Sequence, residues 1–245
     1  MNPRFISLLL VGLLFVSSFF FLGCRNAEVD RLTQQVSQLG RQNAEMRRSY
    51  ERQLADMQAQ LDQAQSELAV LDELGEFLHG VRARLHTNQG PIEVEFFPHV
   101  APIHVFNFVA RAESGFYDGT RFHRVIPGFM IQGGDPLSRE GDKLEMGSGG
   151  PISAIPHEFN EISHTRGVLS MARVSDKRMG AGSQFFIMHA DTPRLDREYT
   201  VFGNVLSGMD VVDAIATTPT HRDDPRLANH PLEPMIIERV EIFRR

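Results

Sequence analysis

A proline-free segment from Ala27 to about Leu78 constrains the architecture of this chain more than any other feature. Its apolar residues recur at steps of three and four, which is the spacing of one face of a long helix. Two successive heptad seams share this spacing: Val29, Leu32, Val36, Leu39, Asn43, Met46 and Tyr50, and then Leu54, Met57, Leu61, Ala64, Leu68 and Leu71. The segment therefore predicts an amphipathic helix about 75 Å long.

So narrow an apolar stripe leaves a lone helix marginal, because helices draw most of their stability from packing. We therefore expect residues 25–80 to form a coiled-coil stalk that self-associates, with a dimer as the preferred state. The alternative is a single helix that folds back on its own domain. Gly75 and Gly80 mark the exit from the stalk into the next domain.

Residues 1–24 have the layout of an export signal. Arg4 precedes an apolar run from Phe5 to Leu22, and Gly23 and Cys24 follow before polar residues begin. This order is typical of a secretory signal, and the cysteine makes it similar to a bacterial lipoprotein signal in which Cys24 carries the lipid. The alternative is an uncleaved signal anchor, because the apolar run just reaches the length of a spanning helix. Both predict a membrane-anchored protein of the cell envelope that faces the periplasm or the cell exterior.

The charge and cysteine content exclude several classes. The net charge is −6 and the basic residues are scattered, so we expect no nucleic-acid partner. Cys24 is the single cysteine of the 245 residues, which excludes an internal disulfide.

Residues 81–245 have a different pattern from the stalk. Apolar and polar residues alternate from Val81 to His86 and from Ile92 to Phe96, around an Asn88-Gln89-Gly90 turn, which predicts a β-hairpin. Helices are expected over 101–114 and 208–216. Short strands are expected over 120–125, 130–133, 167–172, 184–188, 200–205 and 236–243. Many short strands with two helices indicate a barrel or a sandwich.

The stretch from Phe122 to Asp135 carries the chemistry. It sets Arg124 among large apolar residues that must line a core or a pocket, and Gln132 follows eight positions later. A guanidinium stays protonated, so Arg124 can serve only as a fixed hydrogen-bond donor. Such a donor suits the polarisation of an amide better than hydrolysis.

Three further stretches agree with this one: Gly167–Arg173, Gly182–Ile187 and Tyr199–Gly203. Together they resemble the signature of the cyclophilin family of peptidyl-prolyl cis/trans isomerases, from about Val81 to the C-terminus. The resemblance implies a mainly β fold, a closed antiparallel eight-stranded barrel capped by two helices, here preceded by the long coiled-coil helix. It implies proline-containing polypeptides as partners and no cofactor.

The resemblance also implies the roles of the site residues. Arg124 is the expected catalytic donor, and Gln132 orients it and the substrate backbone. The proline pocket would be lined by Phe129, Met130, Phe186 and Leu195, and the groove for the residues before proline by Ala172, Arg173 and Gln184, with Tyr199 at the rim. Arg194 stands where many eukaryotic members have Trp, so weak cyclosporin binding is expected.

Other chemistries fit the sequence less well. No His/Cys spacing resembles a metal site, and His123, His157 and His164 are interpreted as satisfied structural histidines. Ser183 lacks the nucleophile-elbow pattern, and the glycine-bearing stretch 133–150 lacks the ending of a phosphate loop.

Two functions follow from these patterns. The first is an exported, membrane-tethered prolyl isomerase that assists the folding of exported proteins. The alternative is a non-catalytic binding or scaffold protein that holds proline-containing segments and works through its stalk. Because binding alone would not require Arg124, the sequence favours the enzyme.

Overall fold

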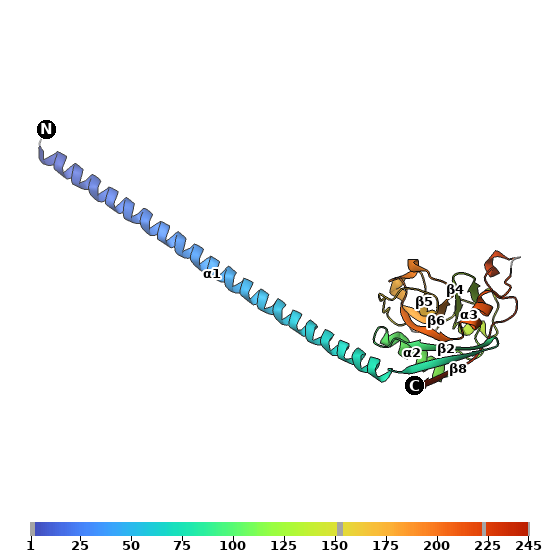
Figure 1. Cartoon of the computed structure of the whole chain (residues 1–245). Helices are drawn as coiled ribbons and strands as arrows, with labels where there is room; N and C mark the ends of the chain where they lie inside the picture. The colour runs from blue at the N-terminus through green and yellow to red at the C-terminus, as the bar shows by residue number, and fades with distance from the viewer. Residues whose placement is uncertain (1–2, 151–153, 222–223, 245) are drawn as a thin grey trace. The chain divides into compact units, whose positions relative to one another are not determined.

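The computed structural model describes residues 3–150, 154–221 and 224–244, with side chains from Ala27 onward except that of Lys177. The chain separates into two compact units, Met1–Ser66 and Glu67–Arg245 (Figure 1). We describe each unit by itself.

Helix α1 runs from Pro3 to Phe77, which confirms the long helix predicted from the heptads. Apart from Leu71, which is half-buried, the large residues of its two seams are exposed on the single chain, from 48% for Met46 to 69% for Val36. An apolar stripe that stays exposed is one that association could cover, so self-association stays a prediction.

The membrane-anchor prediction rests on residues whose side chains the structure does not describe. Within the part of the chain with described side chains, no helix is long and apolar enough to cross a membrane. The apolar run Phe5–Leu22 and the side chain of Cys24 lie outside that part. Anchoring and lipidation therefore stay predictions.

The sheet of the second unit has eight antiparallel strands. These are β1 (Val81–Thr87), β2 (Gly90–Phe96), β3 (Arg124–Ile126), β4 (Met130–Gly133), β5 (Val168–Arg173), β6 (Ala181–Met188), β7 (Val201–Ser207) and β8 (Ile237–Arg244). Their order in the sheet is β3-β4-β6-β5-β7-β2-β1-β8, and Figure 1 shows the twisted sheet that results. The predicted mainly β fold with eight antiparallel strands is confirmed.

The predicted closure of the barrel is only partly matched. The strands form a half-barrel whose two ends, β3 and β8, share no ladder of their own. A single bridge between Arg121 and Ile236 joins the segments that precede these strands. The strand expected over 120–125 begins only at Arg124. The edge of β3 bonds a loop distant in sequence instead of β8, with Val125 N donating to Asn229 O at 2.9 Å.

Two helices pack on the sheet, as predicted. Helix α2 spans Pro102–Glu113 and α3 spans Met209–Ala216, each with one buried apolar face. In the main core, Phe108 lies at the centre of an aromatic group with Phe96, Tyr117, Phe185 and Phe202. Four short 3₁₀ turns occupy the loops: η1 (Pro136–Ser138), η2 (Lys177–Met179), η3 (Pro193–Leu195) and η4 (Pro225–Leu227).

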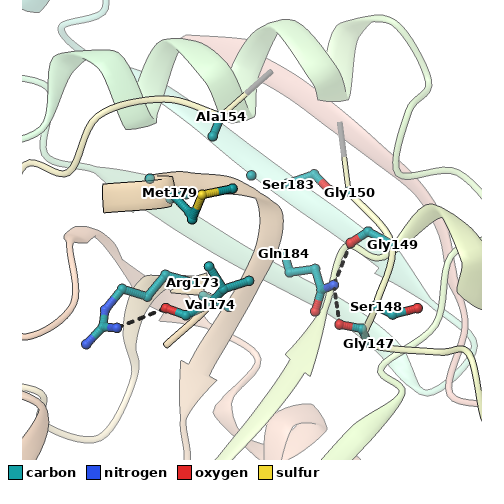
Figure 2. A pocket seen from close by; sticks show the side chains of 14 residues that line it. Gly147, Ser148, Gly149, Gly150, Ala154, Arg173, Val174, Met179, Ser183 and Gln184 are labelled. Atoms are coloured by element: carbon teal, nitrogen blue, oxygen red, sulfur yellow. Dashed lines mark hydrogen bonds between the residues drawn. The ribbon is translucent and has the colours of Figure 1, made fainter. Parts of the chain in front are cut away.

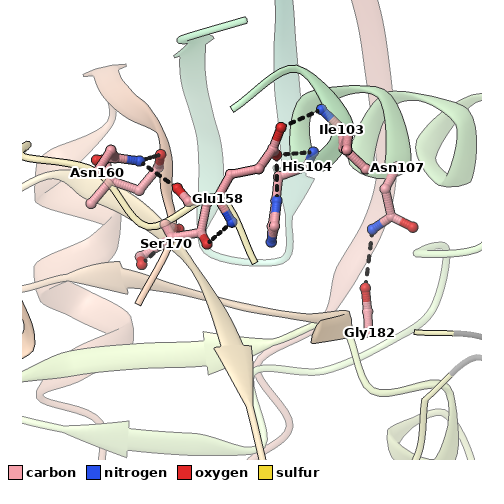
Figure 3. A network of polar contacts seen from close by, with 9 residues as sticks. Ile103, His104, Asn107, Glu158, Asn160, Ser170 and Gly182 are labelled. Atoms are coloured by element: carbon pink, nitrogen blue, oxygen red, sulfur yellow. Dashed lines mark hydrogen bonds and ion pairs between the residues drawn. The ribbon is translucent and has the colours of Figure 1, made fainter. Parts of the chain in front are cut away.

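The N-terminus of α2 is capped by a residue distant in sequence. Ala101 at the N-cap offers no side-chain hydrogen bond. Instead, Glu158 Oε1 accepts from Ile103 N at 3.1 Å, and Oε2 accepts from His104 N at 2.9 Å (Figure 3). The same Oε2 lies 2.6 Å from Nδ1 of the fully buried His104. Glu158 N in turn donates to Thr200 Oγ1 at 3.0 Å, so this network ties α2 to the segment that leads into β7.

Candidate active site

Arg124 and Gln132 lie directly opposite each other on β3 and β4. The turn between the strands contains Pro127 and Gly128, whose φ of +74° favours glycine. Side chains opposite each other in an antiparallel pair share one face of the sheet. Arg124 Nη1 therefore reaches Gln132 Oε1, to which it donates at 3.1 Å.

This hydrogen bond begins a relay that reaches the next strand and a loop. Gln132 Nε2 donates to Gln184 Oε1 at 2.9 Å, and Gln184 Nε2 donates to Gly147 O at 2.9 Å and to Gly149 O at 2.7 Å. The side-chain amides of Gln132 and Gln184 each accept through Oε1 and donate through Nε2, so every donor in the relay points from Arg124 toward the loop carbonyls. It holds Arg124 in a fixed orientation.

The surroundings of Arg124 are partly apolar. Its Nη1 lies 4.0 Å from Met130 Sδ, and the guanidinium carbon lies 5.9 Å from the centre of the Phe129 ring. Burial lowers the pKa of Arg124, but a guanidinium stays protonated. Among the described residues Arg124 has two acceptors, Met130 Sδ and Gln132 Oε1, and Nη1 is the donor to both. Its Nε and Nη2 groups are thus available to a ligand.

A second, smaller apolar cluster lies beside Arg124. Met130 and Phe186 are buried in it, and Phe129, Leu195 and Tyr199 are partly exposed at its surface, together with Ala172. Phe186 and Tyr199 meet edge to face at 5.6 Å between ring centres. The structure thus gathers the four residues predicted for the proline pocket, with Tyr199 and Ala172 at its edge.

The predicted groove is an open pocket of about 540 Å³. Ala172, Arg173 and Gln184 line it together with the glycine-rich segment Gly147–Gly150 and Met179 (Figure 2). Because Gln184 belongs both to this pocket and to the relay, the groove adjoins Arg124.

Arg173 is held firmly at the edge of the groove. Its Nε donates to Glu198 O at 2.9 Å, its Nη1 donates to Val174 O at 3.0 Å, and its Nη2 lies 3.4 Å from Glu198 Oε2. The guanidinium carbon lies 4.6 Å from the Tyr199 ring centre. A glutamate thus compensates the charge of Arg173, and Tyr199 packs against it.

All ten residues predicted for catalysis and substrate binding lie together in this region. Sequence reasoning missed the loop Gly147–Gly150, which forms a wall of the groove and accepts the end of the relay. It also missed Glu198 as the partner of Arg173. The run of glycines was visible in the sequence, but nothing local indicated which side chain its carbonyls would meet.

The structure gives the predicted structural histidines different surroundings. His164 is buried, with Nδ1 3.1 Å from Asp196 Oδ1 and Nε2 3.1 Å from Ser170 Oγ, and its ring stacks on Phe186. His123 is buried too, and its ring nitrogens form no hydrogen bond of full geometry with the described residues, although the backbone of Arg121 lies close enough to raise its pKa. The interpretation of His123 as satisfied stays a prediction. In the same part of the chain, no group of three or more His, Cys, Asp or Glu residues could hold a metal ion.

Known proteins match this part of the chain. A family model described as cyclophilin type peptidyl-prolyl cis-trans isomerase/CLD matches residues 82–242. A peptidyl-prolyl cis-trans isomerase of Acinetobacter baylyi is 42% identical over 170 residues, which cover 67% of this chain and 87% of that protein. One from Synechococcus elongatus is 48% identical over 122 residues, which cover 50% of this chain and 78% of that protein.

The fold is also similar to that of a solved structure. A cyclophilin type peptidyl-prolyl cis-trans isomerase of Cryptosporidium parvum, crystallised in the presence of the dipeptide Ala-Pro, is similar with a TM-score of 0.59 and 34% identity, covering 67% of this chain and 99% of that one. Arg124, Gln132 and the residues gathered around them all lie inside the matched range. The chain therefore belongs to the cyclophilin family of peptidyl-prolyl cis-trans isomerases.

Proposed function

We propose that this protein isomerises X–Pro bonds by a non-covalent mechanism in which Arg124 is the catalytic donor. The observation that carries the proposal is the relay from Arg124 through Gln132 to Gln184, at the border between the proline pocket and the groove. Rotation about an X–Pro bond takes tens to hundreds of seconds without a catalyst, because amide resonance is lost on the way.

The residues divide the work between binding and stabilisation of the twisted state. The proline ring enters the cluster of Phe129, Met130, Phe186 and Leu195, and the residues before it lie in the groove beside Gln184. The structure of the Cryptosporidium parvum relative in the presence of Ala-Pro supports a proline-containing ligand here. In the twisted state the prolyl nitrogen regains its lone pair, and a free N–H of Arg124 stabilises it. Such an interaction favours the transition state over the ground state, which is the requirement for catalysis.

The test compares the full chain with Arg124→Ala, both in detergent micelles, on a short X–Pro peptide. Loss of one positioned donor should lower kcat/KM roughly a hundredfold to a thousandfold, while the affinity for the peptide changes little. Arg239→Ala is the matched control, because this exposed arginine lies on β8, outside the site. An Arg124→Ala protein with more than a third of the parent rate would refute the role of Arg124. An inactive parent would instead favour the non-catalytic binding protein.

The rate should be nearly independent of pH between about 6 and 8, because the guanidinium does not titrate there. A steep profile in that range would point to a histidine as the acting group.

We further propose that the protein works at the cell envelope on exported polypeptides, tethered by its N-terminal segment. The proposal rests on the charged start, the apolar run and Cys24. Retention of Cys24→Ser in the membrane fraction would favour the signal anchor, and its release would favour lipidation. If the parent protein and Cys24→Ser were both found in the cytoplasm, export would be contradicted.

The exposed seams of α1 support association of two chains through the stalk. Sedimentation of the full chain in detergent should give a dimer at tens of micromolar, which Leu61→Lys should dissociate. Gln60→Lys, at the adjacent position, which is also exposed and lies outside the predicted seam, is the control. A monomeric parent would refute the coiled coil.

A further inference from the structure

A cation with no acidic partner among the described residues lies at the edge of the predicted proline pocket. Arg194 belongs to η3, next to Leu195, and its guanidinium carbon lies 5.0 Å from the centre of the Phe129 ring. It is exposed, and it makes no ion pair with any residue that the structure describes. Arg194 is thus held on the pocket wall by an aromatic ring rather than by an acid.

The acidic groups of the neighbourhood are already engaged. Glu198 pairs with Arg173, Asp196 accepts from the backbone and lies against the ring of His164, and Glu161 pairs with Arg197. Arg124 likewise has no carboxylate among its described contacts. Two uncompensated guanidinium groups therefore lie near Phe129, in a chain whose net charge is −6.

Arg194 lies on the side of the predicted proline pocket away from the groove, where the part of a substrate after the proline would lie. The groove beside Ala172, Arg173 and Gln184 takes the residues before proline, and Arg194 does not line it. Phe129 and Leu195 are the partly buried members of the apolar cluster nearest to Arg194, and Arg194 packs on Phe129. With the residues before proline in the groove and the proline on this cluster, the segment after proline would leave past Arg194.

We propose that Arg194 is a specificity-determining residue that selects substrates with an acidic side chain, Asp or Glu, just after the proline. The proposal rests on the proposed function, since it requires the proline to occupy the pocket of Phe129 and Leu195. A guanidinium offers a planar pair of donors that fits a carboxylate. Packing on the Phe129 ring restricts its rotamers before the substrate arrives, which lowers the cost of binding.

The expected effect is modest, because an exposed ion pair in water is weak. A Glu peptide should be turned over about threefold faster than its Gln counterpart, expressed as kcat/KM at low salt. The advantage should disappear as the ionic strength rises to about 0.5 M, since salt screens exposed charges. Glu placed two residues before proline should give a smaller advantage, because Glu198 already compensates Arg173.

The experiment uses the full chain in detergent micelles and peptides that differ only in the residue after proline, which is Glu, Gln or Lys. Both the isomerisation rate and the affinity are measured for each peptide. In Arg194→Gln the ratio of Glu to Gln peptides should fall to about one, and in Arg194→Glu the preference should turn to the Lys peptide. Arg239→Gln removes the same charge on β8 and should keep the parent ratio.

Three results would overturn the proposal: a parent ratio of one, a ratio that survives in Arg194→Gln, or an equal loss of the ratio in Arg239→Gln. The outcome is separable from the proposed function. A parent that fails to isomerise the Gln peptide refutes the catalytic proposal, whereas the affinities for the Glu and Gln peptides still decide the role of Arg194.

Discussion

Glu158→Ala should destabilise the second unit strongly, because Glu158 caps α2 and pairs with a buried histidine. Glu158 caps α2 from a loop more than fifty residues away in sequence (Figure 3). The substitution removes the acceptor of two helix N-terminal amides and the partner of the fully buried His104. Because the side chain of Glu158 is only 13% exposed, water reaches these groups poorly.

The expected loss of stability follows from the groups that lose Glu158 as a partner, which are two backbone amides and the ring of His104. Hydrogen bonds to a charged acceptor contribute about 1.5–3 kcal/mol each, and breaking a buried pair by removing one member costs about 3–5 kcal/mol. We therefore expect a loss of about 3–5 kcal/mol in the free energy of unfolding. For a unit of this size that corresponds to a fall in Tm of roughly 6–20 °C.

The assay is thermal and urea unfolding of the full chain, followed by near-ultraviolet circular dichroism. This signal reports aromatic packing, whereas the far-ultraviolet signal would be dominated by α1. Glu161→Ala is the matched control, because Glu161 is 77% exposed and pairs with Arg197, itself 73% exposed. Loss of such a pair should cost under about 1 kcal/mol.

Either of two results would refute this reasoning. One is a Tm of Glu158→Ala within about 2 °C of the parent, equivalent to less than about 1 kcal/mol. The other is an equal loss in Glu161→Ala, which would mean that net charge rather than the cap decides stability.

Burial lowers the pKa of His123 to about 4, so the unfolded chain binds a proton there between about pH 6.5 and 4 while the folded chain does not. Stability should be full above that range and fall by about 3 kcal/mol as the pH drops through it, and urea midpoints of His123→Leu should lack this part of the slope. Gly134 has a φ of +82°, and a Cβ there would lie 2.5 Å from Ser183 O. Gly134→Ala should therefore lower stability in urea by about 3 kcal/mol, against about 1 kcal/mol for Gly128→Ala, which has a similar φ and open space. An equal loss in the two alanine variants would remove the steric argument. We also propose weak cyclosporin binding, because Arg194 replaces an aromatic residue, and Arg194→Trp should tighten the Kd by about tenfold, or about 1.4 kcal/mol, in an inhibition assay; an unchanged Kd would contradict this.

Most elements of the fold could be predicted because their signals are local. The steps of three and four from Val29 onward predicted α1, and alternation from Val81 to Phe96 predicted the hairpin β1–β2. The segment before Arg124 shows the limit of such signals. It has the composition of a strand, but its backbone bonds residues more than a hundred positions away: Gly119 N donates to Ile237 O, and Phe122 N donates to Met235 O.

In the candidate site, too, some contacts could be expected from the sequence and others could not. The family resemblance led us to expect Gln132 beside Arg124, and the two residues lie opposite each other on β3 and β4. The partner of Gln132 on β6 and the carbonyls of Gly147 and Gly149 were not predicted. These contacts bring together strands and loops that no periodicity relates.

The sequence by itself thus determined the helical stalk, the strand-rich domain and the residue types of the site, because periodicity, turn residues and motif spacing act over a few neighbouring positions. Only the tertiary structure decided that the barrel stays half open apart from the bridge between Arg121 and Ile236, that Glu158 caps α2, and that Arg194 lies beside Phe129 with no acidic partner among the described residues. These outcomes depend on which side chains satisfy each other's hydrogen bonds and charges across long loops, and that competition is settled only when the whole domain packs.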